Sequence, residues 1–133
     1  MENINARLLW EIFKHVRSWL ANLNRASEQR QQDSVKALRE VIIAARETAV
    51  YMRQIQDTEN RHHATESHLA SLWTRLGFEL EDLGLNKLAK RCQITGKHWA
   101  DPTHYDETFL HKADISLETM EKLANQILHH IKN

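Results

Sequence analysis

The stretch VKALREVIIAARETAVYMRQI, residues Val35–Ile55, decides the fold class of this chain. Its apolar residues recur at steps of three and four, the spacing that places them on one face of an α-helix. These residues are Val35, Leu38, Ile42, Ala45, Ala49 and Met52, with Val41 and Ile55 widening the stripe. No glycine or proline interrupts the stretch. It therefore predicts a long helix against whose apolar face the rest of the chain packs.

The whole chain has the composition of an all-α protein. Its 133 residues include three glycines and one proline, while Leu, Ala, Glu, Lys, Arg and Gln, which favour helices, are plentiful. A chain of this length forms one ordinary domain with a core of its own. We therefore expect a single helical-bundle domain over residues 1–133. Its predicted architecture is an antiparallel bundle of four long helices, with a short extra helix and an aromatic-rich loop before the last helix.

Apolar spacing also predicts a helix before the central stretch. This first helix is expected over about residues 3–24, where apolar residues again recur at helical steps. A polar segment separates it from the central helix. Either Ser27 or Asp33 can cap the central helix, because both side chains accept hydrogen bonds from backbone N–H groups. The first residue of the central helix is therefore left open between them.

Three glycines mark the expected ends and contacts of the next two helices. A third long helix is predicted over His68–Leu83, where Gly77 allows a neighbouring helix to approach closely. Gly84 is placed to end this helix in the left-handed conformation. A short helix is predicted over Asn86–Thr95, and Gly96 is expected to close it.

The segment Lys97–Ile115 lacks a long apolar period and contains the only proline. Its aromatic residues, Trp99 and Tyr105 among them, favour a loop that folds over one end of the bundle. The last helix is expected to follow this loop, with Ser116 as its N-cap.

The charge balance argues against a broad electrostatic attraction to nucleic acid or to an anionic membrane, because eighteen basic and eighteen acidic residues cancel. Glu11, Lys14 and Arg17 interrupt the apolar residues near the N-terminus, unlike in a signal peptide. The single cysteine, Cys92, cannot form an internal disulfide. No apolar run approaches the roughly 20 residues of a membrane-spanning helix. We therefore expect a cytoplasmic protein without membrane contact.

Three arginines, Arg39, Arg46 and Arg53, recur every seven residues along the central helix and border its apolar stripe. Charges in this position usually neutralise acidic residues on a neighbouring helix, and that is the interpretation we favour. The alternative is a row of contacts to the phosphates of a nucleic acid.

Nine histidines are the one excess in the composition, so metal binding has to be weighed. Glu59, His62 and Glu66 have the spacing with which helical bundles present carboxylate and imidazole ligands to a pair of metal ions. Such bundles repeat the Glu-x-x-His unit on a second helix, and the unit occurs once in this sequence. We therefore expect no metal at these residues.

A second candidate for a metal site combines His98, Asp101 and His104, which stand three residues apart across the proline. Imidazole and carboxylate are suitable ligands for Zn²⁺ or a similar ion, but nothing in a loop forces these three side chains to converge. We expect no metal or other cofactor and keep these residues as the candidate ligands.

Three apolar residues lie outside the predicted core faces. Ile43 and Val50, seven residues apart, fall on the side of the central helix opposite its stripe, and Trp10 falls outside the apolar face of the first helix. Apolar side chains gathered on outer faces favour an interface. We therefore predict that these residues form an interface in a homo-oligomer, with a two-fold dimer favoured. The rival interpretation is that the loop before the last helix covers Ile43 and Val50.

No motif in the sequence assigns a catalytic or cofactor-binding residue. There is no glycine-rich phosphate loop, no activated cysteine and no strand–turn–helix setting for a serine nucleophile. The favoured function is a non-enzymatic interaction or regulatory module that self-associates and can bind a further protein. The alternatives are a nucleic-acid-binding bundle that uses the three arginines, and a metal-dependent enzyme that uses the histidine-rich loop.

Overall fold

The computed structural model describes Lys14, residues 16–104 and residues 107–131; for residues 107–116 it describes the backbone alone. Every element in this part of the chain is helical, which confirms the predicted all-α class. Residues 16–24 are helical. They are followed by α2 (Glu28–Thr58), α3 (His63–Asp82), α4 (Asn86–Ala100), the 3-10 turn η1 (Pro102–His104) and α5 (Glu107–His130). None of the helices described is both long enough and apolar enough to cross a membrane.

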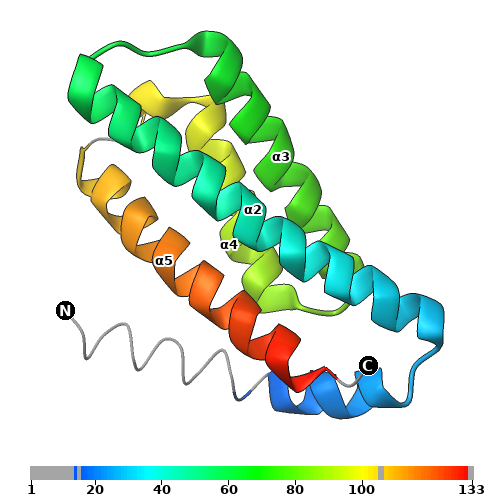
Figure 1. The fold of residues 1–133 in the computed structure, drawn as a ribbon. Helices are drawn as coiled ribbons and strands as arrows, with labels where there is room; N and C mark the ends of the chain where they lie inside the picture. The colour runs from blue at the N-terminus through cyan, green and yellow to red at the C-terminus, as the bar shows by residue number, and fades with distance from the viewer. Residues whose placement is uncertain (1–13, 15, 105–106, 132–133) are drawn as a thin grey trace.

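The helix α2 is the central element of the described fold. It contacts α3 and α5, while α3 packs on α4, and α4 also contacts α5. In Figure 1, α2 lies in front of α4, and the helical residues 16–24 lie near the C-terminal end of α5. The chain therefore returns twice to α2, first through α3 and finally through α5.

Capping sets the length of α2. The Ser27 hydroxyl accepts a hydrogen bond from the backbone N–H of Arg30 at 3.2 Å, so Ser27 rather than Asp33 is the N-cap. The helix ends at Glu59, which has a left-handed φ of 59° and donates its N–H to the Ile55 carbonyl. The helix is longer than the apolar stripe at each end, because the polar residues outside the stripe contain no helix breaker.

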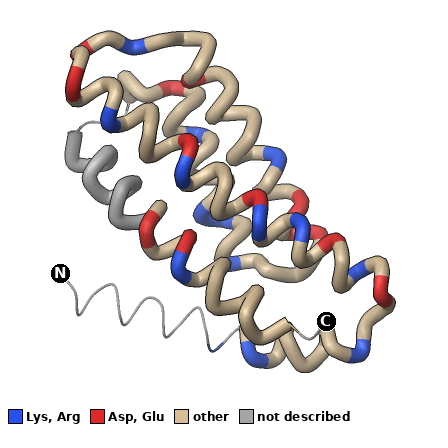
Figure 2. The backbone as a smooth tube through the Cα atoms, in the orientation of Figure 1, with Lys and Arg blue, Asp and Glu red and all other residues tan. Residues whose placement is uncertain are grey.

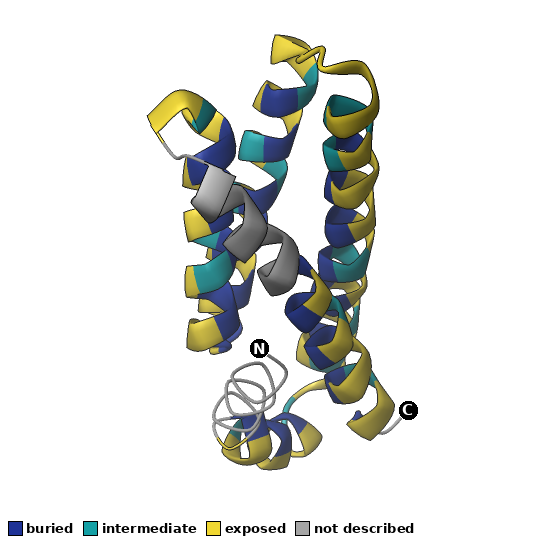
Figure 3. Ribbon diagram, turned by 90° about the vertical axis from the view of Figure 1, so that its left-hand side faces the viewer, coloured by how far each residue is buried: buried dark blue, intermediate teal, exposed yellow. Residues whose placement is uncertain are grey.

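The buried face of α2 is rotated from the predicted stripe. Thr48 and Tyr51 are buried in the core, whereas Ala49, which the periodicity placed inside, is exposed. The buried residues of α2 are Ser34, Ala37, Leu38, Val41, Ala44, Ala45, Thr48 and Tyr51. Figure 3 shows that the buried sides of the long helices face the interior of the molecule. The rotation is possible because the two polar residues have hydrogen-bond partners on the neighbouring helix α3.

Two glycines let α3 and α4 pack closely. A Cβ atom added to Gly77 would collide with the Gln93 side chain and lie 3.1 Å from the Ala89 carbonyl, which confirms the predicted close approach. Gly96 lies inside α4, so the prediction that it closes the helix is wrong. A Cβ atom added there would lie 2.9 Å from the backbone nitrogen of Thr74. Gly96 is thus a second point of close helix packing, because only a residue without a side chain fits there.

The aromatic-rich loop predicted over Lys97–Ile115 is absent from the described backbone. The helix α4 continues to Ala100, the 3-10 turn follows, and α5 already begins at Glu107. Ser116 therefore lies inside α5 and does not cap it. The prediction failed because Pro102 occupies the first position of a short turn, where its missing N–H costs nothing, and therefore does not require a long loop.

The turn between α3 and α4 forms hydrogen bonds with the helical residues 16–24 and with α2. Gly84 follows Leu83, the C-cap of α3, and has the predicted left-handed conformation with a φ of 87°. The preceding Leu83 carbonyl accepts hydrogen bonds from Trp19 Nε1 at 2.7 Å and from Arg30 Nη2 at 3.0 Å. These two bonds connect residues 16–24 and the first turn of α2 to the far end of α3.

Candidate functional site

The outer face of α2 carries two of the predicted interface residues. Ile43 is 48% exposed and Val50 is 57% exposed, although α2 is the central helix of the fold. The rival interpretation takes its cover from residues 97–115, and the side chains of residues 107–116 lie outside those that the structure describes. Trp10, the third predicted interface residue, lies outside the described residues, as does Tyr105. The candidate interaction surface therefore consists of Ile43, Val50 and the residues around them on α2.

Two hollows flank these side chains. The hollow on the side of α3 has a volume of about 550 Å³, and Val50, Tyr51 and Leu69 supply apolar walls. The hollow on the other side has a volume of about 490 Å³ and reaches Ile131 beyond the end of α5. Ile43 lines both hollows. Ile43 thus borders both recesses and Val50 borders the one toward α3, so side chains of a partner can fit beside both residues.

Charged residues of both signs surround the apolar pair, and Figure 2 shows them along α2. Arg46 Nε lies 2.7 Å from the Glu121 carboxylate of α5, as expected for a charge that borders a helix–helix seam. Glu47 lies 3.4 Å from His68 Nε2 of α3. Arg39 and Arg53 are exposed. The three arginines are therefore not equivalent, since Arg46 alone among them has a carboxylate partner in the described residues.

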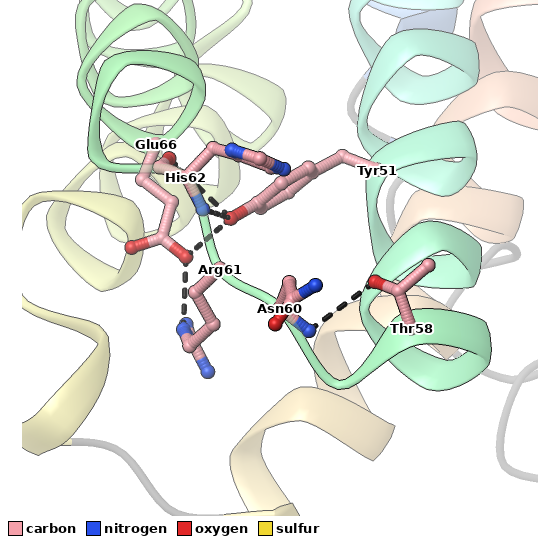
Figure 4. Close-up of polar contacts among 6 residues, drawn as sticks. All are labelled: Tyr51, Thr58, Asn60, Arg61, His62 and Glu66. Carbon is pink, nitrogen blue, oxygen red and sulfur yellow. Dashed lines mark hydrogen bonds and ion pairs between the residues drawn. The ribbon is translucent and has the colours of Figure 1, made fainter.

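A buried polar cluster joins α2 to α3 at the opposite end from the Gly84 turn (Figure 4). The Tyr51 hydroxyl donates a hydrogen bond to Glu66 Oε2 at 2.7 Å and accepts one from the His62 backbone N–H at 2.9 Å. Arg61 Nε donates to the same oxygen of Glu66 at 2.9 Å. Glu66 is buried, and this pairing of its carboxylate compensates for the loss of water. Burial, together with the hydrogen bond to Glu66, raises the pKa of Tyr51, so its hydroxyl stays protonated and acts as the donor.

Aromatic rings continue this cluster into the core. The Trp99 ring lies edge-on to Tyr51, with centroids 5.5 Å apart, and edge-on to His98, with centroids 4.7 Å apart. Nearby, Trp73 Nε1 donates a hydrogen bond to the Thr48 hydroxyl at 2.8 Å. Burial lowers the pKa of His98 to about 4, with Arg61 adding to the effect and Glu66 opposing it. His98 is therefore a neutral core residue at physiological pH.

The candidate metal ligands His98, Asp101 and His104 are not brought together. His98 is fully buried, whereas Asp101 and His104 are exposed at the end of α4 and in the turn after it. His104 Nδ1 lies 3.8 Å from an Asp101 carboxylate oxygen. Among the described residues, no group of three or more His, Cys, Asp or Glu side chains could hold a metal ion.

The other candidate ligands, Glu59, His62 and Glu66, are also dispersed. Glu59 and His62 are exposed on either side of the α2–α3 connection. The Glu66 carboxylate instead receives hydrogen bonds from Tyr51 and Arg61. Sequence reasoning missed this role, although Glu66 stands three residues before Leu69 on the line of apolar residues that α3 buries. An acidic residue on a core stripe predicts a buried partner for it, and that was the available signal.

No protein family, curated protein or solved structure matches this chain. Function is therefore inferred from the described residues themselves. Of the two sites, the cluster around Glu66 is buried and pairs the Glu66 carboxylate within the fold, whereas the outer face of α2 leaves apolar surface in water.

Proposed function

We propose that this chain is a non-enzymatic interaction module that self-associates, most simply as a two-fold dimer, through the outer face of α2. The observation that carries the proposal is the exposure of Ile43 and Val50, one above the other on α2, beside a hollow that both residues line. Exposed apolar side chains that adjoin recesses are typical of protein interaction sites. Burying both against another chain would remove apolar surface from water at no cost to the core.

The proposed scaffold for this face is an antiparallel four-helix bundle of α2, α3, α4 and α5. The contacts of α2 with α3, α3 with α4, α4 with α5 and α5 with α2 support it, because they close a ring of neighbours. We place the module in the cytoplasm. Its single cysteine, Cys92, is buried, and burial raises the pKa of the thiol, so this residue suits a core position rather than a disulfide.

The test compares two double variants with the wild type. In Ile43→Glu with Val50→Glu, charges replace the exposed apolar pair of α2, and we expect folded monomers where the wild type is a dimer. The matched control is Phe78→Glu with Ile94→Glu, which alters apolar residues of similar exposure on α3 and α4. The control should remain a dimer. Light scattering measures the mass of each protein, and circular dichroism measures its helix content.

Four results would refute the proposal. A wild type that is monomeric at high micromolar concentration would exclude self-association. A dimer that survives in the α2 variant, or one lost only in the control, would place the interface elsewhere. Unfolding of the α2 variant would mean that Ile43 and Val50 belong to an internal core.

A further inference from the structure

We infer that the partner at this face is a second copy of the chain, packed with its α2 antiparallel to the first. In this arrangement a two-fold axis passes between Arg46 and Glu47, and Ile43 of each copy lies against Val50 of the other. The inference rests on the proposed self-association and adds to it the direction and register of the two helices.

The position of the axis follows from helix geometry. Four residues at positions i, i+3, i+4 and i+7 surround one point on the surface of a helix. On α2 these residues are Ile43, Arg46, Glu47 and Val50. All four are exposed. A two-fold axis through that point exchanges the first of these positions with the last, and the second with the third. Each apolar residue then meets the other apolar residue, and Arg46 meets Glu47.

The charges farther along α2 agree with the same register. Moving outward from the axis, Glu40 comes to lie opposite Arg53 of the second copy, and Lys36 opposite Asp57. Each of these residues is exposed or half-exposed. In this register Arg46 pairs with Glu47, so every pair of charged residues that the axis brings together has opposite signs. The charges on this face therefore complement those of an antiparallel second copy.

A parallel pairing lacks this complementarity. Lys36, Ile43, Val50 and Asp57 occupy the same place in a seven-residue repeat. A parallel dimer that set Ile43 against its own counterpart would therefore also set Lys36 against Lys36 and Asp57 against Asp57. Like charges placed opposite each other disfavour that dimer.

Existing contacts of the face do not block the antiparallel dimer. Arg46 is held at Nε by Glu121, yet 72% of its side chain is exposed, and a guanidinium group has further N–H donors for a second carboxylate. The hollow beside Val50 lies where Ile43 of the second copy would enter, with Leu69 as part of its wall. Ile43 also borders the other hollow, which extends from it toward the start of α2.

Disulfide cross-linking tests the register. The full chain carrying Ile43→Cys is mixed with the full chain carrying Val50→Cys and a mass tag, under mild oxidation. Cys92 is buried and should not interfere. We expect the mixed disulfide between positions 43 and 50. The two positions 43 would be roughly 10 Å apart along the helix axis at 1.5 Å per residue, too far for a disulfide. Phe78→Cys, on α3, is the control that should form no cross-linked dimer.

Charge reversal provides a second measurement. Lys36→Glu should weaken the dimer by roughly three- to tenfold at low salt, because each dimer contains two such pairs. Adding Asp57→Lys should restore the affinity, since the pair then exists with its signs exchanged. In a parallel dimer Asp57→Lys would give no rescue.

The outcomes separate the inference from the proposal on which it rests. Disulfides between two copies of position 43, together with failure of the charge rescue, would overturn the antiparallel register but leave self-association standing. A wild type without any dimer would overturn both.

Discussion

Tyr51 donates its phenolic hydrogen to the Glu66 carboxylate over 2.7 Å, and this bond joins α2 to α3 next to the connection between them. Arg61, from that connection, donates to the same carboxylate oxygen. One buried acidic group thus holds two helices and the segment that links them.

Tyr51→Phe is expected to destabilise the protein by about 1.5–3 kcal/mol, the range for a hydrogen bond to a charged group. The phenylalanine ring still fills the same place in the core, so the loss of stability should come from the missing hydroxyl alone. Urea unfolding measures the change. The control Thr103→Ala removes an exposed hydrogen bond to Asp101 and should stay within about 0.5 kcal/mol of the wild type. Equal effects of the two changes would contradict the assigned role of Tyr51.

His98 predicts a pH dependence of stability. Its pKa is about 4 in the folded protein, below the ordinary value of 6.5. Between these values the unfolded chain binds the proton more readily than the folded one, so stability should fall as the pH drops through this window. Within this window His98 should change the free energy of unfolding by about 1 kcal/mol per pH unit. Above the window His98 should add nothing to the slope of stability against pH.

Urea unfolding at several pH values measures this slope. His98→Gln should remove the His98 contribution and flatten the curve, whereas His104→Ala, which changes an exposed histidine, should leave the slope close to that of the wild type. A slope that is unchanged in His98→Gln would show that other groups cause the acid sensitivity.

Gly96→Ala is expected to destabilise the protein by roughly 1–3 kcal/mol, because the new methyl group overpacks the contact with the Thr74 backbone. Helix propensity alone predicts the opposite sign, since alanine exceeds glycine by about 1 kcal/mol. Ala49→Gly, at an exposed position of α2, measures that propensity term separately. Thermal unfolding that showed Gly96→Ala to be stabilising would mean that α3 and α4 can separate without cost.

Trp19 and Arg30 share the Leu83 carbonyl as acceptor, so their contributions should not add. Trp19→Phe or Arg30→Met alone should cost about 0.5–1.5 kcal/mol, because one donor remains. The double variant should exceed the sum of the single ones by about 0.5 kcal/mol or more, because the carbonyl then loses both donors. Strict additivity in denaturant unfolding would argue against the shared acceptor.

Features that depend on neighbours in the sequence could be predicted from it. Ser27 is among the two predicted caps, and Gly84 has the predicted left-handed φ, because capping and backbone conformation are decided within a few residues. The role of Gly96 could not be predicted from its neighbours in the sequence. A helix end and a close contact both require glycine, and only the position of α3 distinguishes them.

The polar core shows where periodicity within one helix fails. Thr48 and Tyr51 are buried because Trp73 and Glu66, both on α3, form hydrogen bonds with them. No pattern within α2 reveals those partners, so the sequence predicted a core face that excluded both residues. The three candidate metal ligands are likewise separated by the fold, since His98 occupies the core while Asp101 and His104 lie in water.

The tight packing of α3 on α4 bears on the order in which the chain folds. Leu83, Gly84 and Leu85 alone separate the two helices, so their pairing closes a short loop at little cost in chain entropy. Pairing of α2 with α5 must instead close a loop that contains both of those helices. Local contacts form faster than distant ones, which makes the α3–α4 hairpin the expected nucleus of folding. A methyl group added at Gly96 should then slow refolding more than it speeds unfolding.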